Sequence, residues 1–196
     1  MKEFIRGAVT PQAKNVFVND KFGNSGIKKQ QGSTLVRFDS LPFDGRTTFR
    51  FFEESQQRNF PLSNTGSDGN KLGVGNSMVV ERAYLTYGVY VDGAWTSISK
   101  TDLSSNVAIL TSEFGFEIAN SQVIKNIPIL SWIPEFNKNA ENNLNSNYEF
   151  DTQIIIPPLL EFVATLRTQA YTPVTNAYLR LTIEGSGAII APKTTF

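Results

Sequence analysis

The chain has 196 residues and a formal net charge of zero, with 18 basic and 18 acidic side chains. It contains no histidine and no cysteine, which excludes disulfides and cysteine-type zinc sites and removes the commonest general base and the thiol nucleophile. Because 40% of its residues are hydrophobic and fifteen are phenylalanine, it can bury a substantial core and is not a disordered chain. These properties favour one β-rich domain whose function lies in its surfaces.

The N-terminal segment differs in charge from the rest of the chain. Residues 1–31 hold six basic and two acidic side chains, a net charge of +4, whereas the remainder holds 12 basic and 16 acidic side chains, a net charge of −4. We therefore predict a flexible basic arm over residues 1–33 and one domain over residues 34–196. A terminus without a role is the alternative. The basic residues that would meet a neighbouring subunit or nucleic acid are Lys2, Arg6, Lys14, Lys21, Lys28 and Lys29.

Short runs of β-branched and aromatic residues follow the predicted arm. Thr34–Phe38 and Thr47–Phe52 are predicted strands, and the Asp44-Gly45 pair between them is typical of a turn. Residues 55–77 are rich in asparagine, serine and glycine, which predicts a long exposed loop.

The middle of the chain continues the strand pattern. Met78–Val91 is the longest predicted strand, although neither of its alternating faces is wholly apolar, and Asp92-Gly93 predicts a tight hairpin turn after it. Val107–Ala119 is a further alternating run with Phe114, Phe116 and Ile118 on one face, and Gln122–Ile129 follows. Residues 131–148 combine a proline with many asparagines, which predicts a loop containing a helical turn.

The C-terminal third gives the clearest strand signals. Thr152–Ile156 ends at two prolines, which cannot donate to a sheet ladder, and Glu161–Arg167 and Ala177–Glu184 alternate between apolar and polar residues. The predicted fold is all-β: an antiparallel two-sheet sandwich, a single jelly roll with an extended N-terminal arm. We predict these core residues: Phe162, Leu166, Leu179, Leu181 and Ile183.

Sequence motifs for catalysis are weak. Gly73-Val74-Gly75 precedes a predicted strand, so it lacks the strand-then-helix context of a phosphate loop. Glu113 and Glu117 lie four residues apart on one strand, roughly 13 Å, too far for a glycosidase pair from these two alone. The carboxylates of Glu53, Glu54 and Glu161 leave a glycoside-active enzyme as an alternative, and no cofactor site is predicted.

Two tryptophans are the candidate recognition residues. Trp95 and Trp132 have side chains that stack on sugars in carbohydrate-binding β-sandwiches, and that anchor cores or subunit interfaces more often. A carbohydrate- or receptor-binding module is therefore a second reading of the chain. The asparagines at positions 137–147 offer amide oxygens for calcium, but with Glu141 as the single carboxylate a solvated loop is favoured.

Several segments follow one another in a distinctive order: Arg58–Pro61, Gly75–Tyr84, Ile156–Pro158 with Glu161-Phe162, Tyr178–Gly185 and Ala191–Phe196. In their order and residue composition, these segments resemble the coat proteins of small tailless icosahedral bacteriophages. The resemblance covers most of residues 45–196.

This resemblance implies a jelly-roll capsid subunit, present in many copies, that is made in the host cytoplasm and resides in the virion. Its partners would be further copies of itself and other virion proteins, with a weak genome contact through the arm and no membrane span. The residues agree with this interpretation independently, because abundant aromatic residues, long polar loops and a basic arm are typical of proteins that make protein–protein contacts.

Overall fold

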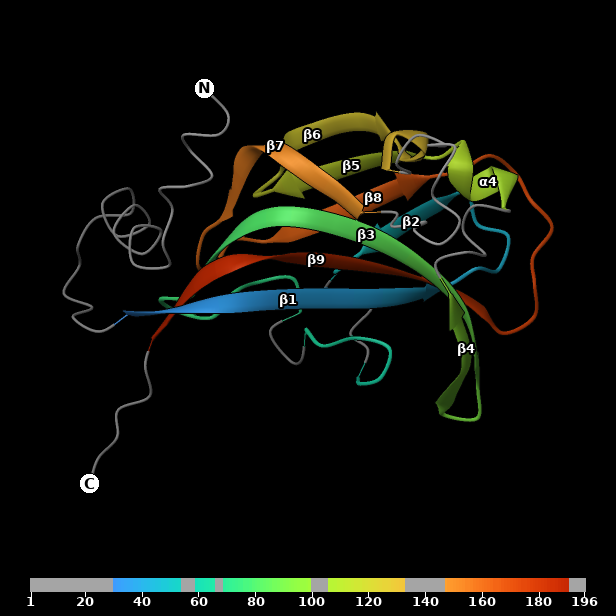
Figure 1. Cartoon of the computed structure of the whole chain (residues 1–196), viewed down its shortest axis with the longest axis horizontal. Helices are drawn as coiled ribbons and strands as arrows, with labels where there is room; N and C mark the ends of the chain where they lie inside the picture. The colour runs from blue at the N-terminus through green and yellow to red at the C-terminus, as the bar shows by residue number, and fades with distance from the viewer. Residues whose placement is uncertain (1–29, 54–58, 66–68, 100–105, 133–146, 191–196) are drawn as a thin grey trace, which may run out of the picture.

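The chain forms two antiparallel β-sheets in a computed structural model, which describes residues 30–53, 59–65, 69–99, 106–132 and 147–190. The two sheets lie in two layers, and the core fills the space between them (Figure 1). The predicted all-β sandwich is therefore confirmed.

The larger sheet contains the longest strands. Its path is β1-β9-β3-β4, and β7 also pairs with β3. The strands are β1 (Gln30–Pro42), β9 (Ala177–Ile190), β3 (Ser77–Val91), β4 (Ala94–Ser99) and β7 (Asn147–Ile156). β1 begins before residue 34, because Gln30–Ser33 pair with the end of β9, opposite Ile190–Gly187. The sheet therefore includes the last residues of the segment that the sequence assigned to the arm.

The smaller sheet has the order β2-β8-β5-β6. Its strands are β2 (Thr48–Phe51), β8 (Phe162–Arg167), β5 (Glu113–Ile118) and β6 (Ser121–Pro128). Buried and less buried residues alternate along β2, β5 and β8, as expected for strands with one face on a core.

The core between the sheets is rich in aromatic residues. The five predicted core residues are 0–1% exposed, which confirms their assignment. Phenylalanines dominate the side contributed by the smaller sheet, and leucine and isoleucine dominate the side contributed by β9. Other fully buried aromatic residues are Phe43, Phe49, Phe51, Phe52, Phe114, Phe116 and Trp132.

A bulge in β3 explains why neither face of this strand is wholly apolar in the sequence. The register with β9 shifts between Val80 and Arg82, so the alternation of faces changes phase there. Glu81, the extra residue, accepts a hydrogen bond from the hydroxyl of Ser186. Gly185 permits the bulge, because a Cβ at this position would lie 1.8 Å from the carbonyl oxygen of Val79.

Two sequence predictions need correction. The run Val107–Ala119 is not a single strand: Val107–Leu110 forms the short helix α4, because the side chain of Asn106 accepts hydrogen bonds from the amides of Ala108 and Ile109. The predicted exposed loop 55–77 is partly buried in the portions described, since Leu72 is 1% exposed and Ser63 is 2% exposed. Local composition did not reveal that these two side chains pack against the sheets.

Three strands are longer than the sequence predicts: β1 continues past Phe38 to Pro42, β7 begins at Asn147 instead of Thr152, and β9 continues past Glu184 to Ile190. Two predicted boundaries agree with the structure. Asp92 and Gly93 form the turn between β3 and β4, and both have positive φ. β7 ends at Ile156, immediately before the two prolines. A single 3-10 turn, η3 (Ile129–Trp132), follows β6.

Candidate functional site

The predicted basic contact residues lie outside the described residues. These are Lys2, Arg6, Lys14, Lys21, Lys28 and Lys29. The asparagine-rich segment considered for calcium also falls outside, except for its last residue, Asn147, which begins β7.

The two tryptophans occupy different environments. Trp132 is 1% exposed and lies in the core, with its ring centroid 4.8 Å from that of Phe114 and 5.6 Å from that of Tyr148. The indole N–H of Trp132 has no hydrogen-bond partner among the described residues. Trp95 is half-buried on the outer face of the larger sheet. The structure therefore places one candidate in the core and the other at a surface.

Trp95 belongs to an aromatic group on this outer face. Its ring centroid lies 5.4 Å from that of Tyr90 and 6.1 Å from that of Tyr178. Gly88 lies beneath the indole, where a Cβ would come 2.9 Å from a ring carbon. The indole N–H donates to the carbonyl oxygen of Pro61 at 3.3 Å. Trp95 is thus fixed by contacts with residues of β3 and β9 and with the backbone of Pro61.

Arg180 is the centre of this surface. Its guanidinium carbon lies 4.3 Å from the ring centroid of Phe38 and 4.6 Å from that of Trp95. Its Nε donates to Ser40 Oγ at 3.0 Å, and its Nη2 donates to the same Pro61 carbonyl. Burial lowers the pKa of Arg180, although the nearby Tyr84 and Asp39 act in the opposite direction. The guanidinium therefore connects β1, β4 and β9 to one backbone carbonyl.

That carbonyl belongs to residues 59–65, which we call the Phe60 loop. Asn64 fixes the loop to β1: its side-chain oxygen accepts from the amide of Phe38 at 2.7 Å, and its Nδ2 donates to the carbonyl of Val36 at 2.8 Å. Ser63 donates to the Phe38 carbonyl at 3.1 Å. Phe60 itself is 81% exposed. A large aromatic side chain is therefore held in solvent on a loop that is anchored at several points.

Sequence reasoning missed Arg180 and Phe60 as members of this surface. Arg180 occupies an outward position of the alternating run Ala177–Glu184. This position predicted that the side chain faces away from the core, but it did not predict which residues the side chain contacts. Phe60 and Pro61 lie within a segment whose composition is that of a loop, and nothing in the segment indicated the sheet face on which it packs.

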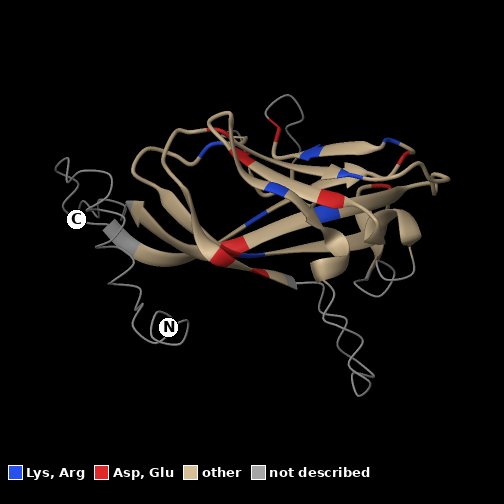
Figure 2. Cartoon of the chain, turned by 90° about the horizontal axis from the view of Figure 1, so that it is seen from above, with Lys and Arg blue, Asp and Glu red and all other residues tan. Residues whose placement is uncertain are grey.

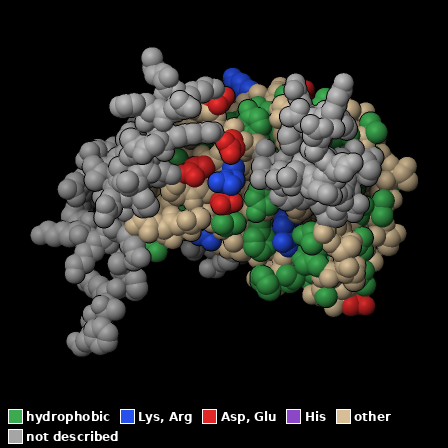
Figure 3. Space-filling view, viewed as in Figure 1, with side chains coloured by type: hydrophobic (Ala, Val, Ile, Leu, Met, Phe, Trp, Pro, Cys, Tyr) green, Lys and Arg blue, Asp and Glu red, His purple; other side chains and the backbone are tan. Residues whose placement is uncertain are grey.

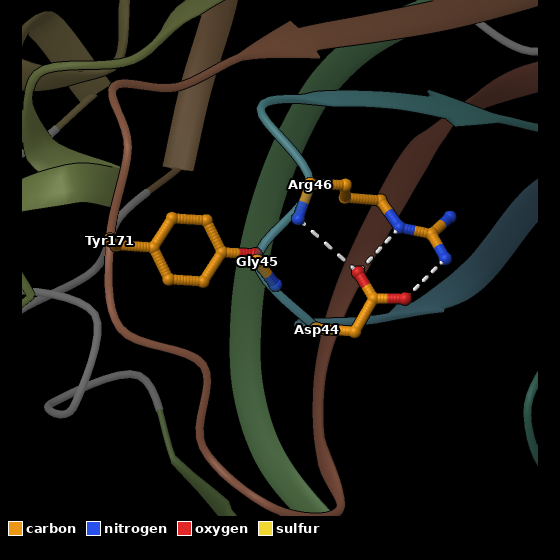
Figure 4. A network of polar contacts seen from close by, with 4 residues as sticks. All are labelled: Asp44, Gly45, Arg46 and Tyr171. Atoms are coloured by element: carbon orange, nitrogen blue, oxygen red, sulfur yellow. Dashed lines mark hydrogen bonds and ion pairs between the residues drawn. The ribbon is translucent and has the colours of Figure 1, made fainter.

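A second polar network links two turns at one end of the sandwich (Figure 4). Arg46 donates three hydrogen bonds to the carboxylate of Asp44, at 3.3 Å from its backbone amide, 2.8 Å from Nε and 2.6 Å from Nη2. The hydrogen bond from Arg46 lowers the pKa of Asp44. The hydroxyl of Tyr171 accepts from the amide of Gly45 at 3.1 Å, and its ring stacks on Phe43 at 3.8 Å between centroids. Burial raises the pKa of Tyr171. This network fixes the connection from β1 to β2.

Basic and acidic residues are interspersed along the strands (Figure 2). The space-filling view likewise shows acidic and basic side chains beside one another near the middle of the molecule (Figure 3). Arg82 lies opposite Glu184 of β9 and Glu149 of β7 in the strand register. Glu113 and Glu117 both lie on β5, where Glu113 is exposed and Glu117 is half-buried.

Within the described ranges, no group of three or more carboxylate, histidine or cysteine side chains is arranged to hold a metal ion. Among the same residues, no helix has the length and apolar character needed to cross a bilayer. Comparison of the sequence with protein-family models and with curated proteins finds no match.

Proposed function

We propose that the sandwich is a single jelly roll and that the chain is a virion structural protein, a capsid subunit that assembles with copies of itself into an icosahedral shell. The strand order is the observation that carries this proposal. β1-β9-β3-β7 face β2-β8-β5-β6, and β4 is an additional strand that follows the hairpin after β3. Of the successive connections, only β3 to β4 and β5 to β6 remain within one sheet. Eight antiparallel strands wrapped in this way are typical of jelly rolls, the fold of many capsid and lectin domains.

The segment order that resembles bacteriophage coat proteins favours the capsid class among jelly rolls. On this proposal the chain is made in the host cytoplasm, is present in many copies in the virion, and contacts other virion proteins. The basic arm would add a weak genome contact. Four net charges dispersed over about thirty residues give a small electrostatic footprint, so protein–protein contacts would dominate assembly.

The Phe60 loop supports a role in such contacts. Aromatic side chains that are fixed before binding make effective interface anchors, because less conformational entropy is lost when they become buried. Phe60 combines 81% exposure with a loop held by Arg180, Trp95 and Asn64. We therefore assign Phe60 to a contact between subunits.

The other readings have less support. In a carbohydrate-binding module, Trp95 would need an open ring face, yet Arg180 stacks over this ring and Gly88 lies against it. Trp132 is buried. Of the carboxylates considered for a glycoside-active enzyme, Glu53 forms an ion pair with Arg50 and Glu161 forms one with Lys71.

Assembly tests the proposal directly. The purified full-length chain is concentrated and followed by light scattering and negative-stain electron microscopy. We expect closed particles of uniform size above a threshold concentration. A chain that remains monomeric at every concentration and ionic strength, with no particles, contradicts the proposal.

Substitution of Phe60 tests the contact. Phe60→Ser should raise the threshold concentration by about tenfold or more, because truncating a buried anchor costs about 2 kcal/mol. Val123→Ser on β6 is the matched control, since Val123 is also exposed, at 48%, but lies on the smaller sheet. Both variants should fold as the wild type does by circular dichroism. An unchanged threshold for Phe60→Ser would exclude Phe60 from the contact.

A further inference from the structure

Three exposed apolar side chains lie on two segments whose backbones meet at one end of the sandwich. Val74 is 67% exposed, Leu159 55% and Leu160 41%. They flank a backbone hydrogen bond of 2.8 Å from the amide of Leu159 to the carbonyl of Leu72. Val74 sits at the tip of a turn closed by the hydrogen bond from Asn76 to Gly73. We call Val74, Leu159 and Leu160 the end patch.

The backbone of Leu159 distinguishes this patch from scattered surface apolar residues. Leu159 has a φ of 62°, in the left-handed region that glycine and asparagine adopt readily and that bulky side chains rarely adopt. A leucine that is strained there and more than half exposed contributes little burial to its own domain. Its presence is therefore better explained by contact with another segment.

The end patch lies at the end of the molecule where the described chain begins and stops. Gln30 and Ile190 are paired partners at the start of β1 and the end of β9. Ser77 lies opposite Ala188, and Met78 opposite Ile156, so the residues just before β3 and just after β7 are at this same end. Figure 1 shows the start of β1 and the end of β9 side by side there.

The 29 residues that precede Gln30 contain an apolar segment of suitable length and position. Val16–Phe22 (VFVNDKF) has four apolar residues in seven, and the eight residues from Phe22 to Gln30 reach at most about 27 Å when extended. Because the segment is covalently attached near the patch, its effective concentration there is high.

We propose that Val16–Phe22 docks on the end patch of its own chain, with Val74, Leu159 and Leu160 covering its apolar side chains. This inference goes beyond the capsid proposal, since it concerns the free subunit and does not require assembly. The two proposals fail separately. An arm that docks in a chain that never forms shells would overturn only the capsid proposal. Shells formed by a chain whose arm is not docked would overturn only the docking proposal.

Amide hydrogen exchange measured by mass spectrometry tests the docking. The full-length chain is used in dilute solution, in which light scattering reports monomers. We expect the amides of residues 16–22 to exchange at least about tenfold more slowly than an unprotected peptide of the same sequence. Leu159→Asn removes the apolar side chain and suits the left-handed backbone, so the domain should stay folded while this protection is lost.

Leu130→Asn is the matched control, because Leu130 is 59% exposed and lies in η3, away from the end patch. It should leave protection of residues 16–22 unchanged. Unprotected exchange of these residues in the wild type overturns the proposal, as does equal protection in Leu159→Asn and wild type. Protection that appears only as the concentration rises would assign the segment to a second copy and would also overturn it.

Discussion

The outer faces of the two sheets are organised differently. In the smaller sheet, β2, β5 and β8 alternate regularly between buried and more exposed residues, and the outward side chains include Arg50, paired with Glu53, and Arg167. In the larger sheet, some outward-facing residues are covered: Thr86 is 9% exposed and Thr182 is 4% exposed. The Phe60 loop and the aromatic residues around Arg180 lie over this face.

This difference shows which interactions a strand pattern reports. In a strand with one face on the core and one in water, apolar and polar residues alternate, so its own sequence shows which side chains are buried. A strand that is covered on both sides depends on segments remote in the sequence. The larger sheet therefore holds both the bulge that disturbs the alternation of β3 and the surface proposed for subunit contact.

The largest expected effect comes from the glycine that permits the bulge. Gly185→Ala should lower the free energy of unfolding by about 3 kcal/mol or more, because its Cβ would overlap the Val79 carbonyl and the backbone has little room to shift. Denaturant unfolding measures the change. The control is Gly115→Ala in β5 of the smaller sheet, where the nearest atoms to the added Cβ are 3.5 Å away, and it should change stability by less than about 1 kcal/mol. Equal losses in the two variants would show that the bulge does not depend on Gly185.

An intermediate effect is expected from Arg180, on the outer face of the larger sheet. Arg180→Ala should lower the free energy of unfolding by about 1–2 kcal/mol, because it removes two ring contacts and two hydrogen bonds from a half-buried group. Arg180→Lys should recover only part of this loss, since an ammonium group cannot reproduce the planar stack.

The control for Arg180 is Arg50→Ala on the smaller sheet. Arg50 pairs with Glu53 at 2.8 Å, but its side chain is 48% exposed, so solvent screens the pair and the loss should be below about 0.5 kcal/mol. Thermal or denaturant unfolding compares the variants. If Arg50→Ala destabilises as much as Arg180→Ala, the proposed difference between the two outer faces is wrong.

The smallest effect is expected at the turn that connects the sheets. Because Arg46 lowers the pKa of Asp44 below its usual value of 3.8, the pair stabilises the folded state above that pH and the contribution is lost as pH falls through the folded-state pKa. The side chain of Asp44 is 47% exposed, so Asp44→Asn should cost less than about 0.5 kcal/mol at pH 7.

The pH dependence separates this effect from a loss of packing. The difference in unfolding free energy between wild type and Asp44→Asn should shrink as pH falls from 5 towards 2, and it should also shrink in high salt. A difference that is constant with pH would mean that the pair makes no electrostatic contribution.

Much of the sandwich could be predicted from local patterns. The alternation in β8 and β9 identified Phe162, Leu181 and Ile183 as core residues, and the Asp-Gly pair identified the turn after β3. The two prolines after Ile156 marked the end of β7. Each of these follows from the chemistry of a few neighbouring residues: apolar side chains at every second position, a glycine suited to positive φ, and prolines without an amide hydrogen.

The candidate site was predicted only in part. Trp95 and Trp132 were both predicted as candidate recognition residues, but the residues around them did not show that one lies in the core and the other at the surface. Arg180 and Pro61 meet although they are 119 positions apart, and Asn64 reaches β1 across 26 positions from Phe38. The helical turn at Val107–Leu110 was missed because the capping side chain of Asn106 outweighed the strand propensity of the residues after it.

By itself, therefore, the sequence determined that this chain folds as a β-sandwich, which residues form much of its core, and that its N-terminal segment and the rest carry opposite charge. Those properties depend on composition and on periods of two residues. Tertiary structure decided where the Phe60 loop lies, which tryptophan is buried and how Glu81 is accommodated in β3. It also decided which apolar residues remain exposed at the end of the sandwich where β1 begins. These outcomes depend on contacts between segments remote in the chain, whose geometry is fixed only when the two sheets pack.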